Sequence, residues 1–294
     1  MHASTTLRLA ALAACFATFS ASADQPFAYE GFDYGPTTNI KLKNGGTGWA
    51  SAWAQVQSIP TGVGTPGLTW PNLVTAGNCA VTAGFGSASF TIYTRILAAY
   101  TPPNNVVYLS FLMEPEFNFG DGGGISFSAT PQMIVGASLA QGVYGLTVPF
   151  VTSSNSTVPV VLGQSALLVA RLTKNTNGTI TYALWVNPPV GGPQPEAPDC
   201  TITEPGNLPA VLALVNDGGF ATDEIRFGPT WTSVLPSVAP ACPADLDHDG
   251  VVGGSDLGIL LGNWATSAGD LDGNGTTDAA DLAILLGAWG GCAS

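Results

Sequence analysis

The sequence predicts a mostly β protein, a jelly-roll β-sandwich followed by a small α-helical module. The chain of 294 residues holds 37 Gly and 22 Pro. Helix interiors exclude both residue types, so a helix bundle or a coiled coil is not expected. Up to residue 235, short runs rich in β-branched and aromatic residues alternate with turns. Beyond that point the chain carries a repeated loop–helix pattern.

The charge balance excludes several classes of partner. The chain has 7 Lys and Arg against 20 Asp and Glu, for a formal net charge of −13. Seven basic residues are too few to neutralise a row of phosphates. Nucleic acid is therefore not an expected partner. The same acidity disfavours binding to an anionic membrane surface. A hydrophobic content of 46% is too high for a disordered chain.

Residues 1–23 have the pattern of a signal peptide. Arg8 precedes an apolar run, and Ala21-Ser22-Ala23 supplies the small residues that a signal peptidase reads. The run is too short for a permanent transmembrane helix, and we expect no membrane span elsewhere in the chain. The mature protein is therefore expected to begin at Asp24 and to be secreted or held at the cell surface.

The cysteines agree with export. Leu12-Ala13-Ala14-Cys15 resembles a bacterial lipobox, so a lipoprotein anchored through Cys15 is the alternative to secretion. Without Cys15 four cysteines remain, and an even number suggests disulfides in an oxidising compartment. We expect the pairing that keeps each disulfide inside one predicted domain. The expected pairs are Cys79–Cys200 and Cys242–Cys292.

The predicted sandwich covers residues 24–235. Two of its strand runs flank Asn177-Gly178, a dipeptide typical of two-residue hairpin turns. Roughly 210 residues are too many for an immunoglobulin sandwich and suit a jelly roll. The clearest runs are SFTIYTRIL (89–97), VVYLSFLM (106–113), LLVARLT (167–173) and TITYALWV (179–186).

An internal repeat marks the module at 241–294, which a Pro-rich linker at 236–240 separates from the sandwich. Residues 245–264 and 270–289 are identical at 11 of 20 positions. Each copy has Asp at positions 1 and 3, Asp or Asn at position 5, Gly at position 6 and Asp at position 12.

This spacing predicts two calcium sites. Ca²⁺ takes six to eight oxygen ligands, and a tight loop presents alternate side chains to one centre. Gly at position 6 allows the sharp turn, and position 7 offers its backbone carbonyl. Mg²⁺ fits less well, because it retains its waters. The expected ligands are Asp245, Asp247, Asp249, Val251 and Asp256 in the first loop and Asp270, Asp272, Asn274, Thr276, Asp278 and Asp281 in the second.

A short helix is expected after each loop, at 256–264 and 281–289. Apolar residues recur there at the i, i+3, i+4, i+7 spacing of one helix face, and we expect the two faces to pack on each other. The module has eight Asp and no Lys or Arg, so its folding is expected to depend on calcium. The two faces are Leu257, Leu260, Leu261 and Trp264, and Leu282, Leu285, Leu286 and Trp289.

The duplicated loop–helix, with Asp at positions 1, 3 and 12 and no entering helix, resembles a type I dockerin. The resemblance implies two calcium ions and docking on a cohesin domain, often in assemblies that degrade polysaccharides. In that family positions 10 and 11 often hold a Ser/Thr pair. Here they are Gly254-Ser255 and Ala279-Ala280, so the cohesin-reading residues do not carry over.

The large domain resembles the concanavalin A-like lectin/glucanase sandwiches of the laminin-G-like kind. That family includes lectins, carbohydrate-binding modules and laminarinase-type hydrolases, so the resemblance implies a polysaccharide partner. The stretches that carry it are Glu30–Tyr34, Gly45–Trp49, Leu184–Pro188, Asp223–Gly228 and Thr230-Trp231.

Catalytic carboxylates are poorly supported. A retaining glycosidase needs two acids close together, and the Glu-x-Asp-x-x-Glu motif of the laminarinase-type relatives is absent. Glu114 and Glu116 are the candidates, because residues i and i+2 share one strand face. Pro115, however, is expected to break a central strand. Asp223 and Glu224 are adjacent, and we expect one of them to pair with Arg226 as a structural group.

We therefore expect an exported, non-catalytic protein with a glycan-binding or surface-interaction sandwich. A divergent glycoside hydrolase and a structural envelope protein with calcium only for stability are the alternatives. About two in three of the tryptophans are expected to be buried, and sequence does not identify the exposed ones. The aromatic candidates for sugar stacking are Trp49, Trp53, Trp70, Trp185, Trp231, Tyr34 and Tyr93.

Overall fold

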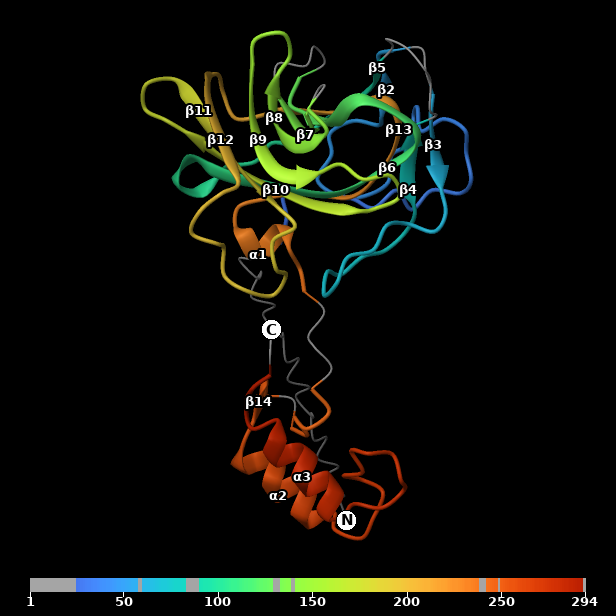
Figure 1. The fold of residues 1–294 in the computed structure, drawn as a ribbon, viewed down its shortest axis with the longest axis vertical. Helices are drawn as coiled ribbons and strands as arrows, with labels where there is room; N and C mark the ends of the chain where they lie inside the picture. Colours follow the sequence, from blue (N-terminus) through green and yellow to red (C-terminus); the bar gives the residue numbers. More distant parts are fainter. Residues whose placement is uncertain are drawn as a thin grey trace, which may run out of the picture.

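A computed structural model describes residues 25–57, 60–82, 90–128, 133–138, 141–237, 242–247 and 249–292. The predicted signal peptide and Cys15 lie outside the described residues. As expected, the fold is a mostly β sandwich followed by a small unit with two short helices (Figure 1). No helix in the described part of the chain is long and apolar enough to cross a membrane.

The strands of the sandwich form one large sheet in which every described pair is antiparallel. Its main order is β12 (Cys200–Pro205), β11 (Thr179–Val186), β10 (Ala166–Lys174), β6 (Val106–Ser126), β13 (Val211–Gly228), β4 (Cys79–Thr82) and β3 (Thr61–Gly64). Off this path lie β1 (Ala28–Glu30), β2 (Ala54–Gln55), β5 (Phe90–Ile96), β7 (Ile134–Ala137), β8 (Val143–Val148) and β9 (Thr152–Pro159). A 3₁₀ turn, η1 (Pro103–Asn105), precedes β6.

Two long strands, β6 and β13, run side by side through the sandwich and shift register at β-bulges. Residues 109–113 of β6 are buried on both faces, because alternate residues there belong to different cores. Phe111 and Met113 lie in the main core between the layers. Leu112 lies in a second core with Trp185, beneath the short helix α1 (Trp231–Val234).

The predicted strand runs fall in β5, β6, β10 and β11, and Asn177-Gly178 forms the turn between the last two. The predicted break at Pro115 is wrong, because β6 continues through this residue. The Pro115 carbonyl accepts from the N–H of Gly163 at 2.9 Å, while the β10 pairing has already ended at Ala166. In an antiparallel strand the N and O of one residue point the same way, so the missing N–H faces a side without a strand partner.

A buried ion pair fixes the start of the sandwich. Glu30 and Arg95 contact each other with side chains about 1% exposed. The Glu30 carboxylate also accepts from the Tyr34 hydroxyl at 2.7 Å, the Trp53 indole N–H at 3.0 Å and the Phe32 N–H at 2.8 Å. Every oxygen of this carboxylate is therefore satisfied by the protein.

One of the two expected disulfides forms. Cys242 and Cys292 are bonded, with their Cα atoms 5.9 Å apart. The expected Cys79–Cys200 bridge is wrong, because these are buried free thiols on β4 and β12. Five steps of strand pairing separate those two strands in the sheet, so the two thiols do not lie on neighbouring strands. Burial raises the pKa of Cys79 to about 12 and that of Cys200 to about 11.

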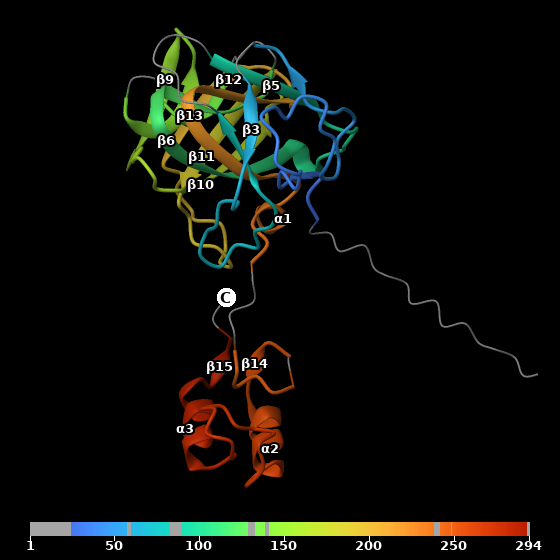
Figure 2. The same cartoon turned by 90° about the vertical axis from the view of Figure 1, so that its right-hand side faces the viewer.

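The C-terminal unit contains two helices of nine residues, α2 (Gly254–Gly262) and α3 (Ala279–Gly287). They lie side by side (Figure 2), with the small ladder of β14 (Val251–Val252) and β15 (Gly290–Gly291) at one end. The core here is small and consists of Ala244, Val252, Leu260 and Leu285, with partly buried neighbours around it.

Only part of the two predicted helix faces is buried. Leu260 and Leu285 are inaccessible to solvent and belong to the core. The prediction that the whole faces pack together is wrong, since Trp264 and Trp289 lie beyond the ends of α2 and α3 and are about half exposed. Two nine-residue helices contact each other along a narrow strip, so Leu261 and Leu286, beside the strip, also face solvent. The exposed members are Leu261, Trp264, Leu286 and Trp289.

Candidate metal centres

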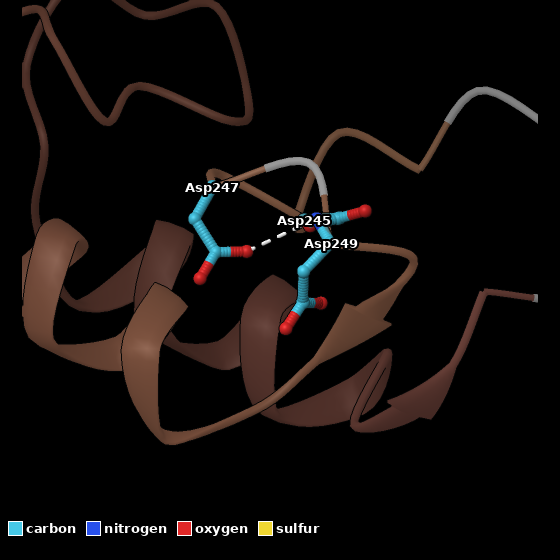
Figure 3. Close-up of side chains that lie close together, drawn as sticks. All are labelled: Asp245, Asp247 and Asp249. Atoms are coloured by element: carbon cyan, nitrogen blue, oxygen red, sulfur yellow. Dashed lines mark hydrogen bonds between the residues drawn. The ribbon is translucent and has the colours of Figure 1, made fainter. Parts of the chain in front are cut away.

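The first loop brings three predicted ligands together. Asp245, Asp247 and Asp249 each offer a carboxylate oxygen, and these oxygens lie within 4.8 Å of one another (Figure 3). Asp245 is 7% exposed, whereas the other two side chains are exposed. Three carboxylates at this spacing form an oxygen-rich, negatively charged centre at the surface of the unit.

Local hydrogen bonds shape this loop. The Asp245 carboxylate accepts from the N–H groups of Asp249 at 3.2 Å and Gly250 at 2.9 Å. Asp249 in turn accepts from the N–H of Val251 at 2.8 Å. Such side chain-to-backbone bonds curl the chain around the carboxylates. Gly250 has φ +90°, which explains the requirement for Gly at position 6.

The second loop also gathers three carboxylates, but its third member comes from position 12 rather than position 5. Carboxylate oxygens of Asp270, Asp272 and Asp281 lie within 4.8 Å of one another. Asp270 accepts from the N–H of Gly275 at 2.6 Å, and Gly275 has φ +96°. Two further predicted ligands of this loop are hydrogen-bonded to each other: the side-chain oxygen of Asn274, at position 5, accepts from the N–H of Thr276, at position 7, at 2.9 Å.

The position-12 carboxylates, Asp256 and Asp281, are inaccessible to solvent. Asp256 accepts three backbone N–H bonds, at 2.7 Å from Gly253, 2.7 Å from Leu246 and 3.1 Å from Asp247. The pKa of Asp256 is lowered, chiefly by the hydrogen bond from the N–H of Gly253. The backbone hydrogen bonds together outweigh burial, which by itself raises this pKa. The carboxylate therefore stays ionised and ties the two ends of its loop together.

The equivalent bonds recur in the second copy. Asp281 accepts from Asp278 at 2.7 Å, Leu271 at 2.6 Å and Asp272 at 3.1 Å, all through backbone N–H groups. The N–H of Asp278 contributes most to lowering the pKa of Asp281. The Asp278 side chain caps α3 by accepting from the N–H of Ala280 at 2.8 Å, whereas the equivalent N-cap of α2 is Gly253.

Sequence reasoning missed the pairing that joins the two copies. Val252, at position 8 of the first loop, pairs with Gly290, beyond α3. At the equivalent place, the Thr277 carbonyl accepts from the N–H of Ala265, beyond α2, at 2.9 Å. Ala265 and Gly290 both have positive φ, +62° and +121°. The same offset of 25 residues that relates the two copies also relates these two pairs. The repeat in the sequence was therefore the signal that could have predicted them.

These residues pass a chemical test for a hard cation. Eight Asp and no Lys or Arg occur in residues 241–294, so no protein cation is available in this segment to balance the converging carboxylates. Repulsion among them weakens the fold unless a bound cation neutralises it. The donors are all oxygens, which suits Ca²⁺ and disfavours soft metals.

The two candidate catalytic acids lie elsewhere, on β6. Glu114 and Glu116 are half-buried, and their i, i+2 spacing places both on one face of the strand. The Glu114 carboxylate accepts a hydrogen bond from the Ser165 hydroxyl. This bond gives Glu114 a structural partner.

The adjacent acids Asp223 and Glu224 are structural, as expected. Glu224 forms a buried ion pair with Arg226. Asp223 is inaccessible to solvent and accepts from the N–H of Leu68 at 2.9 Å, which fixes a loop over the sheet. Burial, followed by the charge of Glu224, raises the pKa of Asp223 to about 8.

Most of the aromatic candidates for sugar stacking are core residues. Trp49 and Trp70 are half-buried. The Trp49 indole N–H donates to the Tyr29 carbonyl at 2.9 Å, and the Arg95 guanidinium lies 4.8 Å from its ring centre. The buried ones, at 8% exposure or less, are Trp53, Trp185, Trp231, Tyr34 and Tyr93.

No family model matches the sequence, and no curated protein matches it. Solved structures match at low similarity. An endo-β-1,4-glucuronan lyase from the fungus Trichoderma reesei is 10% identical, with a TM-score of 0.39, over 71% of this chain and 97% of that chain. A protein of unknown function from Shewanella oneidensis MR-1 is 9% identical, with a TM-score of 0.37, over 72% and 89%. An alginate lyase from a Chlorella virus is 9% identical, with a TM-score of 0.32, over 67% and 100%. Similarity at this level carries no argument about what this chain does.

Proposed function

We propose that the C-terminal unit binds two Ca²⁺ ions and is a dockerin-like interaction module of an exported protein. The observation that carries this proposal is the pair of loops, each of which gathers three carboxylates within 4.8 Å. Backbone N–H groups orient these side chains, so the sites need little rearrangement to accept an ion. Secretion also fits the Cys242–Cys292 disulfide.

Titration of the mature protein with calcium tests this proposal. We expect isothermal titration calorimetry to give two ions per chain, and one ion after either Asp247→Asn or Asp272→Asn. Asp199→Asn, an exposed acid of the sandwich, is the matched control and retains two. Mg²⁺ is expected to bind more weakly, since it dehydrates reluctantly. Absence of calcium binding to the wild-type protein would overturn the proposal.

The dockerin-like part of the proposal implies a cohesin-like protein partner. Positions 10 and 11 of both copies, Gly254-Ser255 and Ala279-Ala280, are exposed. The exposed apolar side chains of Leu261, Trp264, Leu286 and Trp289 are the kind of surface that partners cover. Size-exclusion chromatography with a type I cohesin tests this. Co-elution in calcium and separation in EDTA are expected, whereas separation in both buffers would contradict a cohesin partner.

We propose that the sandwich binds a glycan without cleaving it. The supporting observation is an open cavity at one end of the sandwich, lined by aromatic and polar residues. The absence of the Glu-x-Asp-x-x-Glu motif from the sequence favours binding over hydrolysis, because a retaining glycosidase needs a pair of carboxylates at its site.

Incubation with a panel of soluble and insoluble polysaccharides tests this second proposal. Depletion of the protein from solution and release of reducing ends are measured in the same tubes. Depletion without release is expected. Release that Glu114→Ala or Glu116→Ala abolishes would establish the glycoside hydrolase alternative. Neither depletion nor release would favour a structural envelope protein.

A further inference from the structure

One end of the sandwich contains an open cavity of about 380 Å³. It lies where the end of β6, the β8–β9 turn, β11 and the end of β12 meet, and β8, β9, β11 and β12 share one side of the molecule (Figure 1). Its volume falls in the range of small-molecule sites. The lining residues that matter here are Phe127, Pro149, Val151, Tyr182, Glu204 and Asn207.

The floor of this cavity combines aromatic and polar groups. Phe127 and Tyr182 stack with ring centres 5.9 Å apart and an interplanar angle of 22°. Burial, with the nearby charge of Glu204, raises the pKa of Tyr182 to about 12, so its hydroxyl remains a neutral donor. Asn207 is anchored by the Lys174 ammonium, which donates to its side-chain oxygen at 2.8 Å. A few fixed polar groups on an aromatic wall are the usual composition of a ligand site.

Phe150 is a strained and fully exposed residue in the turn beside the cavity. The N–H of Val151 donates to the Val148 carbonyl at 3.0 Å and closes a tight turn over Pro149 and Phe150. Phe150 has φ +63°, at the third position of a turn with Pro second, where Gly or Asn normally stands. Its side chain is completely exposed to solvent.

Neither feature of Phe150 stabilises the fold. A bulky residue in the left-handed region costs of order 1–2 kcal/mol, and an exposed phenyl ring gains nothing from burial. Pro149 and Val151, on either side of Phe150, both line the cavity. Phe150 itself is not a lining residue. Its ring is held in solvent between two residues that are, where it can contact a ligand that extends out of the cavity.

We propose that this cavity binds a neutral sugar unit of a glycan chain and that the Phe150 ring stacks on the chain where it leaves the cavity. An aromatic face packs against the C–H face of a sugar ring, while the Tyr182 hydroxyl, Glu204 and Asn207 are placed to bond its hydroxyl groups. The Glu204 carboxylate and the Lys174 ammonium, which contacts Asn207, give the site one charge of each sign, so no net positive charge is present to attract uronate or sulfate groups and the site suits neutral units. This inference rests on the proposed glycan binding of the sandwich and assigns it a site.

Calorimetry with defined oligosaccharides tests the site on the mature, calcium-loaded protein. The neutral probes are hexamers of β-1,3-glucan, β-1,4-glucan, β-1,4-mannan and β-1,4-xylan, and the acidic probe is an alginate hexamer. We expect at least one neutral hexamer to bind and the alginate hexamer to bind more weakly.

The variant Phe150→Gly separates a binding role from a structural one. It is expected to weaken binding about tenfold while raising the melting temperature of the sandwich, because Gly accepts the positive φ. Glu204→Gln is expected to weaken binding as well. Leu162→Ala, an exposed apolar side chain outside the lining, is the matched control and leaves binding unchanged.

The outcomes distinguish this site from the broader proposal. If a hexamer binds but neither Phe150→Gly nor Glu204→Gln weakens it, the cavity is not the site, although glycan binding by the sandwich stands. If the protein binds none of the hexamers and none of the polysaccharides in the panel, both proposals fail. A lower melting temperature for Phe150→Gly would show that the ring has a structural role and would overturn the argument from strain.

Discussion

In the sandwich, the buried carboxylate of Glu30 contacts Arg95, whereas in the C-terminal unit the equally buried carboxylates of Asp256 and Asp281 are held by backbone N–H groups alone. The first arrangement balances its charge within the protein. The second leaves net negative charge, and the unit has only a small apolar core to offset it. The difference is the basis of the proposal that the sandwich is stable by itself, whereas the C-terminal unit needs its disulfide and bound calcium.

Removal of the internal counter-charge is expected to have the largest effect on the sandwich. Arg95→Met leaves Glu30 as an unpaired buried carboxylate, and the free energy of unfolding is expected to fall by about 3–5 kcal/mol. Urea denaturation of the sandwich measures this loss. The double variant Glu30→Gln/Arg95→Met is the control and is expected to lose less, because no charge is left buried. A loss below about 1 kcal/mol in Arg95→Met would show that the pair is not important for stability.

Removal of the disulfide is the corresponding change in the C-terminal unit. Cys242→Ser/Cys292→Ser opens a loop with a sequence separation of 50 residues, and the unit is expected to lose about 2–4 kcal/mol in saturating calcium. Leu260 and Leu285 lie in the core of this unit, so hydrogen exchange of their amides in a denaturant series reports its unfolding. The control is Cys79→Ala, a buried free thiol of the sandwich, which leaves this transition in place. An unchanged unfolding midpoint in the double variant would contradict a stabilising role for the disulfide.

The buried acid Asp223 is expected to lower the free energy of unfolding of the sandwich at neutral pH. Asp223 has a pKa raised to about 8 in the folded protein, above its ordinary value of 3.8. The stability it contributes is therefore complete below about pH 4 and is lost as the pH rises through 8. Asp223→Asn should be progressively more stable than the wild-type sandwich between pH 5 and pH 9, as melting temperatures will show. The exposed Asp33→Asn is the control, and a constant difference across this range would contradict the assignment.

The smallest expected effect concerns the helix that covers the outer core. Thr230 and Ser233 form a reciprocal capping box at the start of α1, which places Trp231 against Trp185. Thr230→Ala is expected to cost about 1 kcal/mol in the free energy of unfolding of the sandwich. Urea denaturation measures it, with Thr201→Ala on the exposed face of β12 as the control. Equal losses in both variants would show that the cap has no special role.

Features set by local sequence were predictable. The strand runs, the Asn177-Gly178 turn and the convergence of the loop carboxylates depend on neighbouring residues, and the structure contains the turn and the convergence. Gly250 and Gly275 have the positive φ that their loop position requires.

Features set by distant contacts were not predictable. The Cys79–Cys200 pairing failed because the order of strands in the sheet, which no local pattern encodes, keeps β4 and β12 apart. The expected break at Pro115 failed because it depended on where β10 ends. Helical spacing assigned Trp264 and Trp289 to the core, although both helices end before them. Phe150 was missed, because its positive φ and its full exposure are visible only in the structure.

The central claim is that the C-terminal unit depends on calcium and the sandwich does not. Hydrogen exchange of the mature protein, measured in calcium and then in EDTA, tests it directly. The account predicts that the amides of Leu260 and Leu285 lose their protection in EDTA, while those of Leu168 and Leu184 in the sandwich core keep it. Equal protection of Leu260 and Leu285 in both buffers would contradict the claim.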